Sequence, residues 1–224
     1  ARVRRYRSID DSTPFDVERR VTCLVGKNES GKTATLQALY KSLPVDGDAA
    51  FDLTMDYPSH RTREATAAKV PPEVTYLSYE LDDHDAQAVE EVLGQGALIG
   101  RTVTYTTRYD GSKTVDVQVD EAAVVKHLLD GLELPPSAAQ AAHDAVTAAD
   151  MVAVLEEMEV SSPAADAVIA KVTKWRESRP SLKAIDILGG RRPRFVYFGD
   201  YDVMPGKVSI PDLIERREDG TLTR

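Results

Sequence analysis

An eight-residue segment constrains the fold of this chain more than any other part of the sequence. Residues 26–33 read GKNESGKT and fit the pattern G-x-x-x-x-G-K-[ST]. Glycines let such a loop wrap around a phosphate, because they adopt dihedral angles that are closed to other residues. The loop amides and the N-terminus of a following helix direct partial positive charge at the anion. The segment therefore predicts a phosphate-binding loop.

The residues on either side of the loop favour the same prediction. Residues 21–25 have the composition of a buried strand, and residues 33–40 have that of a helix. The motif works in this order of strand, glycine loop and helix. Lys32 would then reach the β- and γ-phosphates of a nucleotide, and the Thr33 hydroxyl would ligate Mg²⁺. The predicted nucleotide-binding residues of the loop are Gly26, Lys27, Asn28, Glu29, Ser30, Gly31, Lys32 and Thr33.

Composition limits the class of protein. The 224 residues are 42% hydrophobic and 29% charged, as in ordinary soluble globular proteins. No apolar run approaches the ~20 residues that span a bilayer, so we expect no membrane partner. The net charge of −9 argues against general nucleic-acid binding by bulk attraction. The single cysteine, Cys23, cannot form an internal disulfide, which favours the cytoplasm, and its place in the expected strand favours packing.

The elements expected along the chain place a β-hairpin before the loop. Its strands cover residues 2–9 and 13–17, with a turn at residues 10–12. A helix capped by Asp82 or Asp83 runs to residue 93. Further strands are predicted over residues 51–55, 74–81, 101–109, 114–119 and 194–198, with a hairpin turn at residues 110–111.

Residues 121–190 have a helical, alanine-rich pattern. Helices are expected over residues 150–158 and 163–175, and an apolar stripe that ends at Trp175 favours helix packing over ligand binding. We therefore expect an α/β fold in which residues 1–224 form one lobe and residues 121–190 form a helical insertion. A last helix is predicted to begin near residue 211.

The hairpin and the loop together resemble the N-terminal lobe of ABC-type ATPases of the AAA family, in the branch that contains the SMC, RecF and OLD proteins. Residues 6–9 match the aromatic-basic-Ser first strand of that branch, and Asn28 and Ser30 match two further loop positions. Many P-loop kinases and small GTPases instead place the loop directly after their first strand. The specific match covers about the first forty residues.

This resemblance implies a P-loop NTPase fold with ATP and Mg²⁺ as cofactors. It implies that Arg7 faces the nucleotide, that Asn28 lies at the γ-phosphate and that Thr33 holds the metal. It also implies partners: a C-terminal lobe of the same protein, a second protomer in a homodimer, and DNA through the full-length protein. Such proteins couple ATP binding and hydrolysis to dimerisation in DNA repair, DNA maintenance or phage defence. Adenine is favoured because the guanine-specifying Asn-Lys-x-Asp motif is absent.

The chain departs from the family pattern in elements that the family needs for hydrolysis. Residues 188–190 (LGG) lack the serine of the signature, and no apolar strand ends in Asp-Glu. A metal-sensing glutamine is missing near residues 195–198; Asp200 or Asp202 could replace it, although a turn residue that caps the next segment is the simpler interpretation. We expect that the chain is the N-terminal lobe of a longer protein. Alone, it should bind ATP but hydrolyse it poorly.

Two alternatives stay open. One is a small P-loop kinase in which Arg61, Arg63 and Arg101 close over a phosphoryl acceptor. The other is a non-catalytic, nucleotide-gated module in which residues 121–188 contact a partner. Basic groups near residues 2–7, 191–194 and 216–217 are read as solvated surface or as a local polyanion patch. The four histidines have no metal-ligand spacing.

Overall fold

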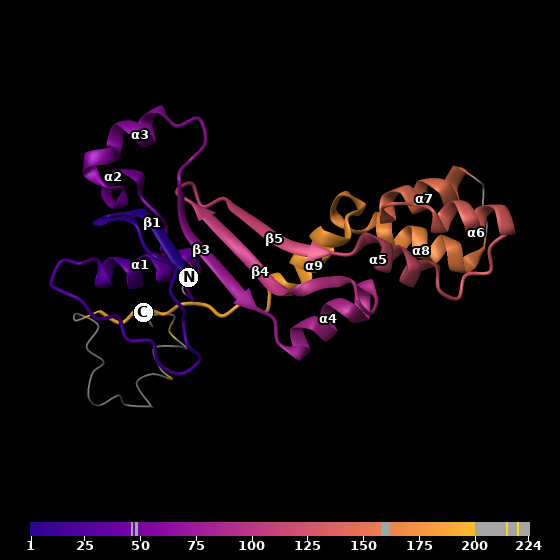
Figure 1. Cartoon of the computed structure of the whole chain (residues 1–224), viewed down its shortest axis with the longest axis horizontal. Helices are drawn as coiled ribbons and strands as arrows, with labels where there is room; N and C mark the ends of the chain where they lie inside the picture. Colours follow the sequence, from indigo (N-terminus) through magenta and orange to yellow (C-terminus); the bar gives the residue numbers. More distant parts are fainter. Residues whose placement is uncertain (46, 48, 158–161, 200–213, 215–218, 220–224) are drawn as a thin grey trace.

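The computed structural model describes residues 1–45, 47, 49–157, 162–199, 214 and 219. Within these ranges the chain is an α/β protein with a five-stranded antiparallel sheet in the order β2-β1-β3-β4-β5 (Figure 1). The α/β class is thereby confirmed, whereas the P-loop NTPase fold stays a prediction. The strands are β1 (Arg2–Tyr6), β2 (Ile9–Asp11), β3 (Glu73–Glu80), β4 (Leu98–Arg108) and β5 (Lys113–Val119).

Nine α-helices accompany the sheet in the described residues, and they lie in three groups along the elongated molecule (Figure 1). The first three lie with β1 at one end, α4 and α9 lie beside the sheet, and α5–α8 gather at the far end. The helices are α1 (Lys32–Ser42), α2 (Leu53–Asp56), α3 (Thr62–Ala67), α4 (Asp83–Leu93), α5 (Glu121–Leu129), α6 (Pro136–His143), α7 (Ala148–Glu157), α8 (Pro163–Thr173) and α9 (Pro180–Gly189).

Alternation of side chains orients the central strands as the sequence predicts. Leu77 of β3 lies opposite Tyr105 of β4, and both are buried, whereas Ser78 and Thr104 on the other face bond each other through their hydroxyls. The period of two in a strand separates these faces. The side chain of Asp82 accepts a hydrogen bond from Asp85 N and begins α4, which confirms the predicted cap.

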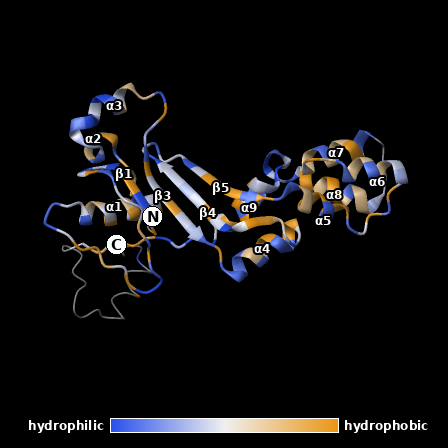
Figure 2. Ribbon diagram, viewed as in Figure 1, coloured by the Kyte–Doolittle hydropathy of each residue, from blue (hydrophilic) through white to orange (hydrophobic). Residues whose placement is uncertain are grey.

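Two hydrophobic clusters stabilise the two halves of the molecule. The larger lies where α4 and α9 pack on β4 and β5 and continues through α5 into α7, and Figure 2 shows hydrophobic residues gathered where α4 and α9 meet the strands. It includes Trp175, so the packing role predicted for the stripe on α8 is confirmed. The smaller cluster joins β1, α1 and β3 around Tyr6, Ala38 and Val74. The smaller cluster therefore fixes the helix that follows the glycine loop.

Two arginines fix the chain after α9 to the rest of the molecule. Arg191 Nε donates to Asp85 Oδ1 at 2.6 Å, and the Arg192 guanidinium lies 4.1 Å from the centre of the Tyr105 ring. A cation over an aromatic face is attracted by the ring quadrupole. These members of a basic group serve packing and ion pairing within the chain.

The strands expected over residues 13–17 and 51–55 were wrong, and the strand expected over residues 2–9 is divided into β1 and the start of β2. The hairpin turns at residues 7–8 and not at 10–12, so β2 is Ile9–Asp11 and residues 13–17 form no strand. Residues 53–56 form α2 because the Asp52 side chain accepts from Thr54 N and Met55 N. Such a cap satisfies the free amides of a first helical turn. This local stabilisation of a helix outweighs the preference for a strand that the apolar composition of residues 51–55 indicated.

The strand expected directly before the glycine loop is also absent. Residues 21–25 have no regular structure, Val21 is 78% exposed, Val25 is 86% exposed, and Cys23 is exposed rather than packed. A strand needs a neighbour to satisfy its backbone groups, and no described strand lies beside this segment.

The strand expected at residues 194–198 is reduced to one bridge, in which Phe195 pairs with Pro44. Phe198 is 71% exposed, so the segment is not buried as expected. The candidate metal residue Asp200, Asp202, the basic pair at 216–217 and the helix expected from residue 211 lie outside the described residues, apart from residue 214. No helix in the described part is long and apolar enough to cross a membrane.

Candidate phosphate-binding site

The glycine loop leads directly into α1. Gly31 is the N-cap of the helix and has a left-handed backbone with φ of +93°. A Cβ on Gly31 would lie 2.9 Å from Cγ1 of Ile9, which is closer than carbon atoms pack. Glycine is therefore required here both for its backbone conformation and for the close approach of β2. The turn that precedes it is closed by a hydrogen bond from Ser30 N to Lys27 O at 3.3 Å.

Lys32 folds back over the loop that precedes it. Its ammonium donates to the carbonyl oxygens of Gly26, at 2.8 Å, and Lys27, at 2.6 Å. Both bonds are exposed to solvent. Phosphate oxygens compete well for such a donor, because their negative charge adds a Coulomb attraction that a neutral carbonyl lacks. The lysine thus has the position and the freedom to contact an anion held in the loop.

The first turn of α1 presents positive potential and has no acidic side chain of its own, while Glu29 of the preceding loop lines the pocket at this helix end. No Asp or Glu lies in that turn. The first amides of a helix have no partner within the helix, and the macrodipole adds to their attraction for anions. Thr35 N and Thr35 Oγ1 both bond Gly31 O, which closes the first helical turn behind the free amides. An anion is therefore favoured at Thr33 and Ala34.

A pocket of about 390 Å³ lies at this helix end and adds the β1–β2 turn to the site. Among the predicted residues, Arg7, Glu29, Gly31, Lys32 and Thr33 line it, whereas Gly26, Lys27, Asn28 and Ser30 belong to the loop but not to the lining. Ser8 and Ala34 complete the lining. A larger cavity of about 560 Å³ lies between β5 and α9, and none of the predicted site residues lines it.

A residue that sequence reasoning missed lies behind Arg7. Asp56 ends α2 and is almost completely buried, with 1% of its side chain exposed. Its carboxylate accepts from Lys41 Nζ at 2.6 Å and from Arg7 Nε at 3.2 Å. Asp56 falls in a segment that reads as a loop, so only the tertiary contact with Arg7 identifies it.

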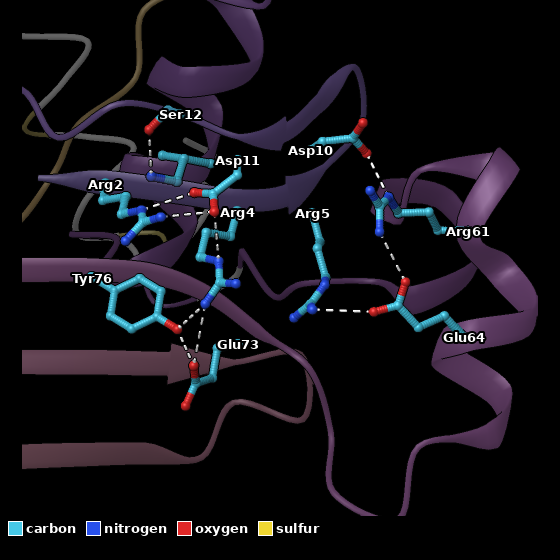
Figure 3. Close-up of polar contacts among 11 residues, drawn as sticks. Arg2, Arg4, Arg5, Asp10, Asp11, Ser12, Arg61, Glu64, Glu73 and Tyr76 are labelled. Carbon is cyan, nitrogen blue, oxygen red and sulfur yellow. Dashed lines mark hydrogen bonds and ion pairs between the residues drawn. The ribbon is translucent and has the colours of Figure 1, made fainter.

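The other N-terminal arginines are neutralised by carboxylates. Arg2 and Arg4 both contact Asp11, at 2.7 and 3.2 Å, and Arg5 contacts Glu64 at 3.1 Å (Figure 3). The hydrogen bond from Arg2, helped by the charge of Arg4, lowers the pKa of Asp11. A basic patch for a polyanion is not favoured here, because each of these cations already has an acidic partner.

Two of the three arginines of the kinase alternative are occupied in the same way. Arg61 contacts Asp10 at 2.8 Å and Glu64 at 3.1 Å, and Arg101 contacts Asp83 (Figure 3 for Arg61). None of them lines the pocket at the glycine loop. This arrangement counts against closure of these side chains over a phosphoryl acceptor.

The described residues contain no group of three or more His, Cys, Asp or Glu side chains that could hold a metal ion. A metal at this site would thus depend on Thr33, on the nucleotide itself and on water, as Mg²⁺ commonly does at phosphates. Comparison of the chain with protein-family models, with curated proteins and with solved structures found no match.

Proposed function

We propose that this chain is the ATP·Mg²⁺-binding lobe of an ATPase that resembles the SMC, RecF and OLD proteins and has their P-loop NTPase fold. One observation carries the proposal: the glycine loop runs into the free N-terminus of α1 at a pocket that also contains Arg7. Backbone amides, one lysine and one arginine around a pocket are the groups that bind a polyphosphate.

The residues present fit a nucleotide phosphate better than a free metal ion. Lys32 holds its ammonium over the loop, and the pocket lining contains two cations, Arg7 and Lys32, against one acid, Glu29. The bound cofactor would supply the phosphoryl group and Mg²⁺ would neutralise its charge. Thr33 would ligate the metal through its hydroxyl, while Arg7 and Lys32 would orient the phosphates.

Exposed apolar residues before the loop and after α9 support a partner lobe. Val21, Val25 and Phe198 are each more than two-thirds exposed. They lie on segments that have the composition of a strand but do not form one in the structure. Strands of another lobe would bury these side chains and pair their backbone groups. ATP held between this loop and a second protomer would then drive dimerisation, and the full-length protein would act on DNA.

A nucleotide-gated interaction module is a second candidate. Helices α5–α8 lie at the opposite end of the molecule from α1, where a partner could reach them without blocking the pocket (Figure 1). This function requires ATP binding but no hydrolysis. ATP-dependent association that persists with a non-hydrolysable analogue, together with no turnover in the full-length protein, would favour it over the ATPase.

Titration of the chain with a fluorescent ATP analogue and Mg²⁺ tests the proposal. We expect Lys32→Ala to weaken binding by about 10- to 100-fold, because it removes charge-assisted hydrogen bonds to the phosphates. Lys69→Ala is the matched control, since it removes an exposed lysine that lies outside the loop and does not line the pocket. Equal binding by wild type and Lys32→Ala, or no binding by either, would refute the proposal.

A second assay tests whether the site is incomplete. The isolated chain should bind ATP yet release almost no phosphate, because the signature and acidic strand of the family are absent from it. Phosphate release by the isolated chain that disappears in Lys32→Ala would show a complete catalytic site and contradict the partner-lobe model.

A further inference from the structure

Asp56 is a buried carboxylate between two cations. In addition to Lys41 and Arg7, it accepts a hydrogen bond from Asp52 N at 3.0 Å. Burial alone would raise the pKa of Asp56, but the hydrogen bonds from Lys41 and Asp52 N outweigh it and lower the pKa. The carboxylate is therefore charged at neutral pH, and it is compensated by two positive side chains rather than one.

Arg7 is held by the same residue through both its backbone and its side chain. Arg7 N donates to Asp56 O, while Arg7 Nε donates to the Asp56 carboxylate. Arg7 has φ of +50°, a left-handed conformation that is uncommon for a residue with a side chain. Such a conformation persists only where surrounding contacts impose it, and it is often found at functional sites.

Two further contacts restrict the guanidinium. Arg7 Nη1 donates to Gln37 Oε1 of α1, and Cζ lies 5.4 Å from the centre of the Tyr6 ring. Its Nη2 has no hydrogen-bond partner among the described residues, and Arg7 lines the pocket at the glycine loop with 44% of its side chain exposed. Nε and Nη1 of the guanidinium are thus occupied, and Nη2 is available to a ligand.

We infer that Asp56 is a positioning residue, which holds the guanidinium of Arg7 at the pocket to receive a phosphate group of the nucleotide. The inference rests on the proposed function, since the pocket must take a nucleotide. An unrestrained arginine has to be ordered when it binds, whereas a side chain fixed beforehand avoids that entropic cost. Lys41 lets Asp56 do this without loss of positive potential, because the trio of Arg7, Lys41 and Asp56 keeps a net charge of +1.

Binding of a fluorescent ATP analogue with Mg²⁺ to variants of the whole chain tests the inference. Asp56→Asn alone would leave Lys41 unpaired, so it is combined with Lys41→Gln, and Lys41→Gln by itself is the matched control. Relative to that control, we expect the double variant to bind about 5- to 20-fold more weakly, as for one well-placed charged hydrogen bond. Thermal melting of each variant verifies that it is folded.

A double-mutant cycle separates positioning from a merely structural role. In an Arg7→Ala background, where the positioned group is missing, the Asp56→Asn change should alter affinity by less than about twofold, because the two changes act on one interaction. An equal loss in both backgrounds, or no loss in either, would overturn the inference.

A measurement on the wild-type chain covers the case in which the Asp56 variant does not fold. The Nε–H proton of Arg7, assigned by comparison with Arg7→Lys, should exchange slowly with solvent because Asp56 accepts it. Fast exchange would overturn the inference. Failure of the proposed function can be distinguished from failure of this inference alone, because wild type and Lys32→Ala would then bind the ATP analogue equally. The inference would fail in that case as well.

Discussion

Replacement of Gly31 by alanine is the sharpest structural prediction for the loop, and Gly111→Ala is its matched control. Both glycines have positive φ, of +93° and +79°. A Cβ at Gly31 would meet Ile9 Cγ1 at 2.9 Å, whereas a Cβ at Gly111 would have no neighbour within 4 Å. The two substitutions therefore share the backbone penalty and differ in the steric contact.

The expected sizes follow from these two terms. A left-handed conformation costs a non-glycine residue about 1–2 kcal/mol. The overpacking against buried Ile9 adds about 1–3 kcal/mol at Gly31, because Ile9 lies in the smaller hydrophobic cluster and cannot move freely. We expect Gly111→Ala to lower the free energy of unfolding by about 1–2 kcal/mol and Gly31→Ala by about 2–5 kcal/mol.

Denaturant titration and thermal melting of the three proteins measure these differences. For a chain of this length, about 1 kcal/mol corresponds to about 2–4 °C in Tm. Gly31→Ala should also weaken binding of the ATP analogue, since Gly31 lines the pocket, whereas Gly111→Ala should not. Equal destabilisation by the two substitutions would refute the close contact between Gly31 and Ile9.

Other predictions concern the packing of α1, the buried carboxylate and the segment before the loop. Thr75→Val should lower the free energy of unfolding by about 0.5–1.5 kcal/mol in denaturant titration, because it removes the 2.8 Å hydrogen bond between the buried Thr75 and Ser42 hydroxyls, while Ser42 Oγ keeps its bond to Ala38 O; an unchanged midpoint would contradict this. The lowered pKa of Asp56 means that its contribution to stability is present above the pKa of the unfolded chain and is lost as the pH falls through the folded pKa. Asp56→Asn in the Lys41→Gln background should therefore flatten the acid limb of the stability profile, and an unaltered limb would be inconsistent with a charged Asp56. The exposed thiol of Cys23 should react with a thiol reagent at the rate of the unfolded chain, and strong protection would show that residues 21–25 are covered.

Elements that are fixed by residues close together in the sequence could be predicted. The β4–β5 hairpin turns at residues 110–111 because Gly111 takes a positive φ there, and α4 begins at its Asp82 cap. The order of glycine loop and helix was likewise correct, because Gly31 and Lys32 belong to a local motif. These signals act over one turn of chain, so distant residues do not override them.

Elements that depend on distant partners could not be predicted. Residues 21–25 are as apolar as a buried strand, yet no described strand pairs with them. The turn of the first hairpin moved to residues 7–8, where Asp56 fixes Arg7 in a left-handed conformation from almost fifty residues away. The spacing of residues along the sequence does not predict such a contact.

The sequence alone therefore determined that a glycine loop with Lys32 and Thr33 opens a helix, since these residues carry both the conformation and the charge. Only the tertiary structure decided that Arg7 lines the same pocket, that Asp56 holds it there, and that the other N-terminal arginines are neutralised by ion pairs. The physical reason is that neighbouring residues set the local backbone conformation. The charge available at a site depends instead on which side chains folding brings within a few ångströms of it.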